Sequence, residues 1–166
     1  MDKQQKRILT VIALLCAAVL VTVCILLALR SKPIRQDFTP PPFEPQALTG
    51  IPPAMESEAS YGRMTVNPGF AFCLCAKPTL TENALNLYAT APEGNTVWIL
   101  VKIYDEAGIL LGQSGLLRPG EYCEAIALSA IPPQGATLTA KVLSYEPDTY
   151  YSRGSAQAIL TVSRAS

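Results

Sequence analysis

The sequence contains no histidine among its 166 residues. This absence removes the Ser-His-Asp and Cys-His schemes of nucleophilic catalysis, together with the commonest proton shuttle at physiological pH. Phosphate-binding loops, dinucleotide fingerprints and the His-Glu-x-x-His helix of metalloproteases are absent as well. We therefore expect a protein that is not an enzyme and that carries no cofactor.

The sequence also offers few residues that could bind a metal or form disulfide bonds. Only five cysteines occur, and two of them, Cys16 and Cys24, lie in an apolar run near the N-terminus. Without histidine or a second closely spaced cysteine pair, the remaining Cys73, Cys75 and Cys123 give a metal site a weak basis, and we expect none. Their odd number favours buried thiols, while a disulfide from Cys123 to Cys73 or Cys75 stays open.

An excess of positive charge is missing from most of the chain. Residues 1–35 carry six Lys or Arg and one acid, whereas residues 61–166 carry seven bases and eight acids. The basic excess therefore lies only near the N-terminus, where it suits anionic lipid headgroups. No basic face for nucleic acid is expected on the remainder, so nucleic acid is excluded as a partner.

One long apolar run is present near the N-terminus. From Ile8 to Leu29 no residue is charged, and a helix of this length covers a bilayer core of about 30 Å. A cleavable signal peptide has a shorter apolar region and a small-x-small cleavage site, which "ALR" at the end of the run does not supply. We predict a retained transmembrane helix over 8–29 that binds the lipid bilayer.

The orientation of this helix is not determined by charge, because three basic residues flank it on each side. Long globular segments translocate with little regard to flanking charge. We therefore expect a cytoplasmic tail over 1–7 and an extracytoplasmic C-terminal domain, in a single-pass protein of the cell membrane.

Proline is concentrated between the apolar run and the rest of the chain. Seven prolines fall in residues 30–60, including the triplet Pro40-Pro41-Pro42. No helix tolerates this density, and the composition is typical of a semi-rigid spacer with polyproline II character. We predict a proline-rich linker over 30–60, with a ligand for a proline-reading module as the alternative.

From Tyr61 onward, short apolar runs alternate with polar residues and are separated by turn residues. The run "TVWILVKIYD" places Val97, Ile99, Val101 and Ile103 on one face, and similar alternation occurs in "FAFCLCA", "ALNLYAT", "ATLTAKVLSY" and "AQAILTVS". About seven or eight strands at this spacing predict an all-β domain over 61–166, an immunoglobulin-like β-sandwich.

Three pairs of acids are the remaining candidates for acid–base chemistry: Asp105/Glu106, Glu121/Glu124 and Glu146/Asp148. Paired carboxylates serve glycoside hydrolysis in other proteins. Each pair falls at an expected turn or strand edge, where acids are ordinarily solvated. A carboxylate-dependent enzyme is therefore the third hypothesis, behind two binding functions.

The most unusual segment of the domain is "YEPDTYYSRGS", residues 145–155. Tyrosines at a loop tip supply contact area at low entropic cost and a hydroxyl handle. The alternative is a hairpin connection whose tyrosines, like the single tryptophan, cover the sheet. The candidate contact residues are Trp98, Tyr145, Asp148, Tyr150, Tyr151 and Arg153.

The apolar anchor, the proline-rich stalk, "NTVWILVKIYDEAGILLGQSGLLRPGEY" and "YEPDTYYSRGS" together resemble a set of small uncharacterised membrane-anchored proteins of Gram-positive, Clostridia-type bacteria, some linked to conjugative or mobile elements. The resemblance implies an envelope protein, with a role accessory to a transfer or secretion apparatus, and carries no functional residues. We expect a protein-interaction or structural module that docks an envelope protein. A binding module for a cell-wall glycan or small ligand is the alternative, with Trp98 and the 145–155 tyrosines as stacking platforms.

Overall fold

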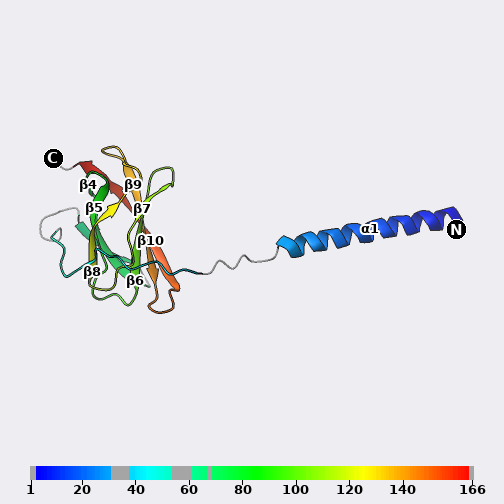
Figure 1. Ribbon diagram of the computed structural model, residues 1–166, viewed down its shortest axis with the longest axis horizontal. Helices are drawn as coiled ribbons and strands as arrows, with labels where there is room; N and C mark the ends of the chain where they lie inside the picture. The colour runs from blue at the N-terminus through cyan, green and yellow to red at the C-terminus, as the bar shows by residue number, and fades with distance from the viewer. Residues whose placement is uncertain (1–2, 31–37, 54–60, 67–68, 165–166) are drawn as a thin grey trace. The chain divides into compact units, whose positions relative to one another are not determined.

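The computed structural model describes residues 3–30, 38–53, 61–66 and 69–164. The chain divides into two compact units, Met1–Thr39 and Pro40–Ser166. The first contains one helix and the second contains the strands (Figure 1).

The helix α1 spans Lys3–Arg30, a length of 28 residues. It begins before the predicted boundary at Ile8 because Lys3, Gln4, Gln5, Lys6 and Arg7 all have high helix propensity. Residues 3–7, predicted as a tail, are therefore helical.

Within the described ranges, no helix combines the length and the apolar character that crossing a membrane requires.

The second unit consists of two sheets. One has the strand order β1-β8-β5-β3-β2, with β4 and β11 beside β5. The other has the order β10-β9-β6-β7, and its strands are all antiparallel. In chain order the strands are β1 (Leu48–Thr49), β2 (Tyr61–Val66), β3 (Phe70–Cys75), β4 (Thr79–Leu80), β5 (Ala84–Thr90), β6 (Trp98–Tyr104), β7 (Leu110–Gln113), β8 (Glu121–Ala127), β9 (Thr137–Tyr145), β10 (Ser152–Thr161) and β11 (Ser163–Arg164).

The core lies between the two sheets and follows the period-two pattern of the sequence. In β6 the residues Ile99, Val101 and Ile103 are buried in this core, and in β9 so are Leu138 and Val142. Burial alternates along β5 and β9 in the same way. Alternating side chains reach opposite faces of a sheet, so each strand contributes one face to the core. The predicted all-β sandwich is confirmed.

Part of the segment predicted as a spacer belongs to the folded unit. Residues 40–49, called the closing segment below, join both sheets. Phe43 forms a parallel bridge with Leu116, whose neighbour Leu117 bridges Ile99 in β6. A few residues later, β1 pairs with β8 in the other sheet. The prediction of a linker over 30–60 is therefore corrected for residues 40–53, while residues 31–37 and 54–60 lie outside the described ranges.

The physical reason is that proline lacks an N–H but keeps its carbonyl. The Pro42 carbonyl accepts a hydrogen bond from the Leu116 N–H at 2.9 Å, and the Glu44 N–H donates to the Leu116 carbonyl at 2.9 Å. A proline-rich segment can therefore pair at the margin of a sheet, where half of its N–H groups need no partner.

Gly115 permits the close approach of the closing segment. A Cβ atom at this position would lie 2.7 Å from the carbonyl carbon of Phe43 and would also overlap the Glu44 backbone. The Gly115 N–H donates to the Glu44 carboxylate at 2.6 Å, which fixes the segment in register. A glycine is required here because the two backbones leave no room for a side chain.

We expect Gly115→Ala to destabilise the domain by about 1–3 kcal/mol, because the added methyl group must displace the closing segment. The matched control is Gly94→Ala, since a Cβ at Gly94 meets no atom within 4 Å; its effect should stay within about 0.5 kcal/mol. Unfolding of the full chain, followed by the emission of the single tryptophan, measures both. Equal stability of the two variants would contradict this packing.

Candidate functional site: an aromatic row beside the β9–β10 turn

Three aromatic side chains from distant parts of the sequence form a row on the outer face of the four-stranded sheet. Trp98, at the start of β6, lies between Phe43 of the closing segment and Tyr150 of the turn between β9 and β10. The Phe43 and Trp98 ring centroids are 4.8 Å apart at 76°, and the Trp98 and Tyr150 centroids are 5.3 Å apart at 63°. Phe43, Trp98 and Tyr150 are called the aromatic row below.

A fixed cation stands at one end of the row. The guanidinium carbon of Arg118 lies 3.6 Å from the Phe43 ring centroid, a cation–π contact. The same guanidinium forms an ion pair with Glu121 at 3.2 Å, and the Glu121 carboxylate also accepts the Arg118 N–H at 2.7 Å. Arg118 is half exposed, so it presents positive charge to solvent from a defined position.

The turn between β9 and β10 is held by its own hydrogen bonds. The Tyr150 N–H donates to the Glu146 carbonyl at 3.0 Å, and the Glu146 N–H donates to the Tyr151 carbonyl at 2.9 Å. The Thr149 hydroxyl bonds the Glu146 carboxylate at 3.1 Å. This bonding fixes the direction of the tyrosines at the end of the sandwich.

Two residues of this turn have left-handed backbone conformations, Asp148 with φ 66° and Tyr150 with φ 57°. Aspartate tolerates this region, whereas tyrosine adopts it at a cost of about 1 kcal/mol or more. The edge-to-face contact between the Tyr150 and Trp98 rings offsets that cost. The turn and the row therefore stabilise each other.

The structure brings together only some of the predicted contact residues. Trp98 meets Tyr150 and lies opposite Tyr145 in the register of β6 and β9. Tyr151 is next to the row in sequence and is 72% exposed. Arg153 instead lines a separate hollow with Gly69, Thr96, Val97 and Ser152, and Asp148 is exposed in the turn.

Sequence reasoning missed Phe43 and Arg118. An available signal for Phe43 was an aromatic residue within "PPPFEP", because a solvated spacer gains nothing from a large apolar ring. Arg118 carried no local signal, since its role depends on the position of Phe43.

The row is chemically a neutral, half-buried aromatic surface with one cation beside it. Beside the row, Tyr145 lies opposite Trp98, and burial raises the pKa of its phenol, which therefore stays neutral at physiological pH. Because each ring of the row packs edge to face on its neighbour, the three rings do not form one flat platform for stacking. It is suited to contact with a shaped, partly apolar surface.

One acid of each of the three predicted pairs is engaged in local structure. Asp105 accepts the Ile109 N–H at 2.7 Å, Glu121 binds Arg118, and Glu146 accepts the Thr149 hydroxyl. Each of these carboxylates closes a turn of its own.

The cysteines of the domain, Cys73, Cys75 and Cys123, are buried, as predicted. Cys123 faces the core, and burial raises the pKa of its thiol to about 12. Cys73 lies beside Tyr61 and Arg63 in a shallow hollow of about 390 Å³, where burial raises its pKa as well. Raised thiol pKa values keep both groups protonated and poorly nucleophilic.

In the described part of the chain, no three Cys, Asp or Glu side chains are placed to hold a metal ion.

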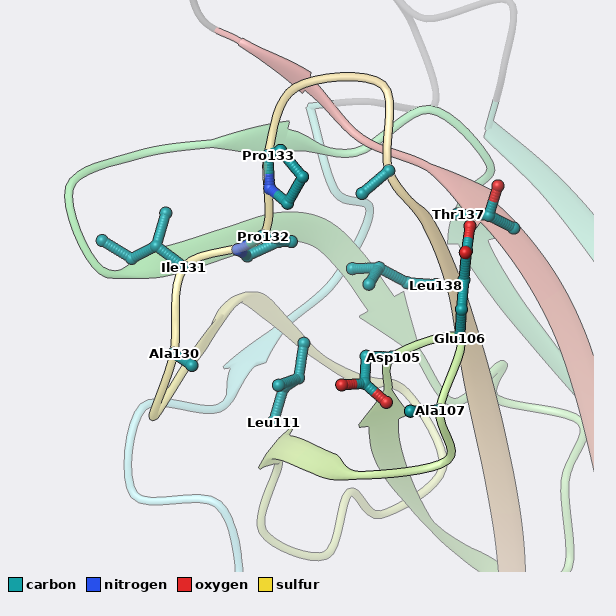
Figure 2. A pocket seen from close by; sticks show the side chains of 11 residues that line it. Asp105, Glu106, Ala107, Leu111, Ala130, Ile131, Pro132, Pro133, Thr137 and Leu138 are labelled. Carbon is teal, nitrogen blue, oxygen red and sulfur yellow. The ribbon is translucent and has the colours of Figure 1, made fainter.

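A third hollow, of about 460 Å³, lies between the turn after β6 and the loop before β9 (Figure 2). Leu111 and Leu138 extend into it beside Pro132 and Pro133, and Asp105 stands on the other side. Its lining is mostly apolar, and the Asp105 carboxylate already serves the turn. The hollow therefore lacks the convergent polar groups that orient a small ligand.

No protein family and no curated protein matches this sequence. Among solved structures, CopC from Methylosinus trichosporium OB3b is 14% identical and aligns over 64% of this chain and 96% of its own, with a TM-score of 0.36.

The aromatic row predicts different effects for two adjacent tyrosines. Tyr150→Ala should lower stability by about 1–2 kcal/mol and shift the Trp98 emission to longer wavelength, because it exposes the indole and removes a ring contact. Tyr151→Ala should change stability by less than about 0.5 kcal/mol and leave the emission unchanged. Fluorescence and unfolding of the full chain measure both, and an unchanged Trp98 emission in Tyr150→Ala would contradict the row.

Proposed function

We propose that this protein is a single-pass, membrane-anchored module of the cell envelope whose immunoglobulin-like sandwich docks another envelope protein. The uncharged run of residues 8–29 supports the anchor, because its length suits a bilayer. Large apolar side chains of α1, including Val11, Leu14 and Leu20, are 56–66% exposed and need an apolar surrounding. In this proposal the N-terminus is cytoplasmic and the sandwich is extracytoplasmic.

The observation that carries the docking function is the aromatic row with its rigid turn. Tyr151 is presented beside a row of packed rings, and Arg118 adds a positioned cation at the far end of that row. Aromatic residues and arginine are enriched at the energetic centres of protein interfaces. A surface that is ordered before binding also loses less entropy when a partner docks.

The alternative, a binding site for a wall glycan or small ligand, is favoured by one observation, the exposed ring of Tyr151. The edge-to-face geometry of Phe43, Trp98 and Tyr150 is less suited to it, because sugar rings stack on flat aromatic faces. A protein partner is therefore the better match. A role accessory to a transfer or secretion apparatus, and kinship with Clostridia-type membrane-anchored proteins, stay predictions.

A photo-cross-linking amino acid at Tyr151, in the full chain on intact cells, tests the docking function. We expect one adduct of defined mass, identified by mass spectrometry as an envelope protein. The same amino acid at Glu82, an exposed loop residue, is the matched control and should give no such adduct. Adding Tyr150→Ala should weaken the adduct at least several-fold, because the turn loses its support.

The same cells report on sidedness, since added protease should degrade the sandwich from outside. A sandwich protected in intact cells would overturn the proposed orientation. An equal yield of adduct from the cross-linker at Tyr151 and at Glu82 would contradict docking through the row. Absence of a protein adduct, with wall-glycan binding that is lost in Tyr151→Ala, would favour the alternative.

A further inference from the structure

In the described part of the chain, the four-stranded sheet ends in a long strand that no other strand covers on its outer side. β10 (Ser152–Thr161) has ten residues, and β9 is its one partner among the described strands (Figure 1). The other margin strands differ from it: β7 has four residues, β1 and β11 have two each, and β2 carries Arg63 within its regular register. Short strands and charge protect sheet margins against pairing with another chain.

The outward-facing groups of β10 follow from one hydrogen bond at its end. The Thr161 N–H donates to the Ala76 carbonyl at 3.0 Å, so it points away from β9. The register with β9 is regular from Gly154 to Thr161, and backbone direction alternates with a period of two. Ser155, Gln157 and Ile159 therefore direct their N–H and C=O groups outward. Within the described chain, we find no hydrogen-bond partner for these groups.

The side chains of this margin offer no charge repulsion. Arg153 is the single charged residue of β10, and Ile159 is 63% exposed. Ala156 and Ala158 alternate with Ser155, Gln157 and Ile159 and face the core. Their small side chains leave room for a second backbone. Apart from Arg153 at the irregular start of the strand, β10 is uncharged and free of proline, and it exposes one apolar side chain; such an edge is open to pairing.

We propose that β10 pairs antiparallel with β10 of a second copy of this chain, about a two-fold axis at Gln157. In this register Gln157 faces Gln157 and Ser155 faces Ile159, while the outward N–H of Thr161 keeps its bond to the Ala76 carbonyl. Every outward N–H and C=O of the three central residues then finds a partner, which gives about six hydrogen bonds. Ala156 faces Ala158, so the pairing is free of steric conflict on the core side as well.

A second copy fits this margin better than an unrelated strand because the strand is self-complementary. The Gln157 amide donates to and accepts from its own copy, and the apolar Ile159 meets the small Ser155. A two-fold contact of this kind is the commonest way in which soluble proteins form homo-oligomers. The inference does not depend on the proposed function.

Sedimentation of the full chain in detergent tests the dimer. Gln157→Pro removes an outward N–H without removing a bond to β9, and edge strands tolerate proline at such positions. It should weaken dimerisation at least about tenfold, since two hydrogen bonds across the axis are lost. Gln157→Ala is the matched control, because it keeps the N–H and should stay dimeric.

Charge variants keep the test informative if the proline variant does not fold. Gln157→Lys and Gln157→Glu should each sediment as monomers, and an equimolar mixture should restore the dimer, because only a two-fold register places residue 157 opposite itself. A wild-type chain that is monomeric at all concentrations would overturn the proposal. A dimer that persists in Gln157→Pro, Gln157→Lys and Gln157→Glu would also overturn it, because that dimer would associate through another surface such as α1. Pairing of β10 only with strands of other proteins would overturn it as well.

Discussion

The contact between the closing segment and Gly115 is the constraint on which the domain and its candidate site depend. The Glu44 carboxylate accepts the Gly115 N–H at 2.6 Å, and the backbones approach so closely that only glycine fits. This contact sets the register in which Phe43 reaches Trp98. It also directs the chain from the margin of one sheet to that of the other, where β1 pairs with β8.

The aromatic row follows from this arrangement and not from any single strand. Its three rings come from the closing segment, from β6 and from the turn after β9, and each ring is placed by a different set of backbone bonds. Tyr150 adopts a left-handed backbone conformation that ring packing stabilises. The surface beside Tyr151 is therefore ordered by long-range contacts.

The sequence predicted the sandwich because alternation is a local signal. Ile99, Val101 and Ile103 share a face wherever the strand is placed, so β6 and its core face followed directly. The closing segment could not be predicted in this way, because its prolines suppress every local strand signal and its pairing depends on Leu116. Of the six predicted contact residues, Trp98 and Tyr150 meet, while Arg153 lines another hollow. Contacts between distant segments decide these outcomes, and residue patterns do not encode them locally.

Amide hydrogen exchange at Leu116 tests the central claim most directly. Its N–H donates to the Pro42 carbonyl at 2.9 Å, so protection of this one amide reports whether the closing segment is docked. We predict exchange as slow as that of Ile99, which bonds the Leu117 carbonyl inside the domain. Exchange at Leu116 as fast as at the exposed Gly94 would contradict the account, since residues 40–49 would then be a free spacer.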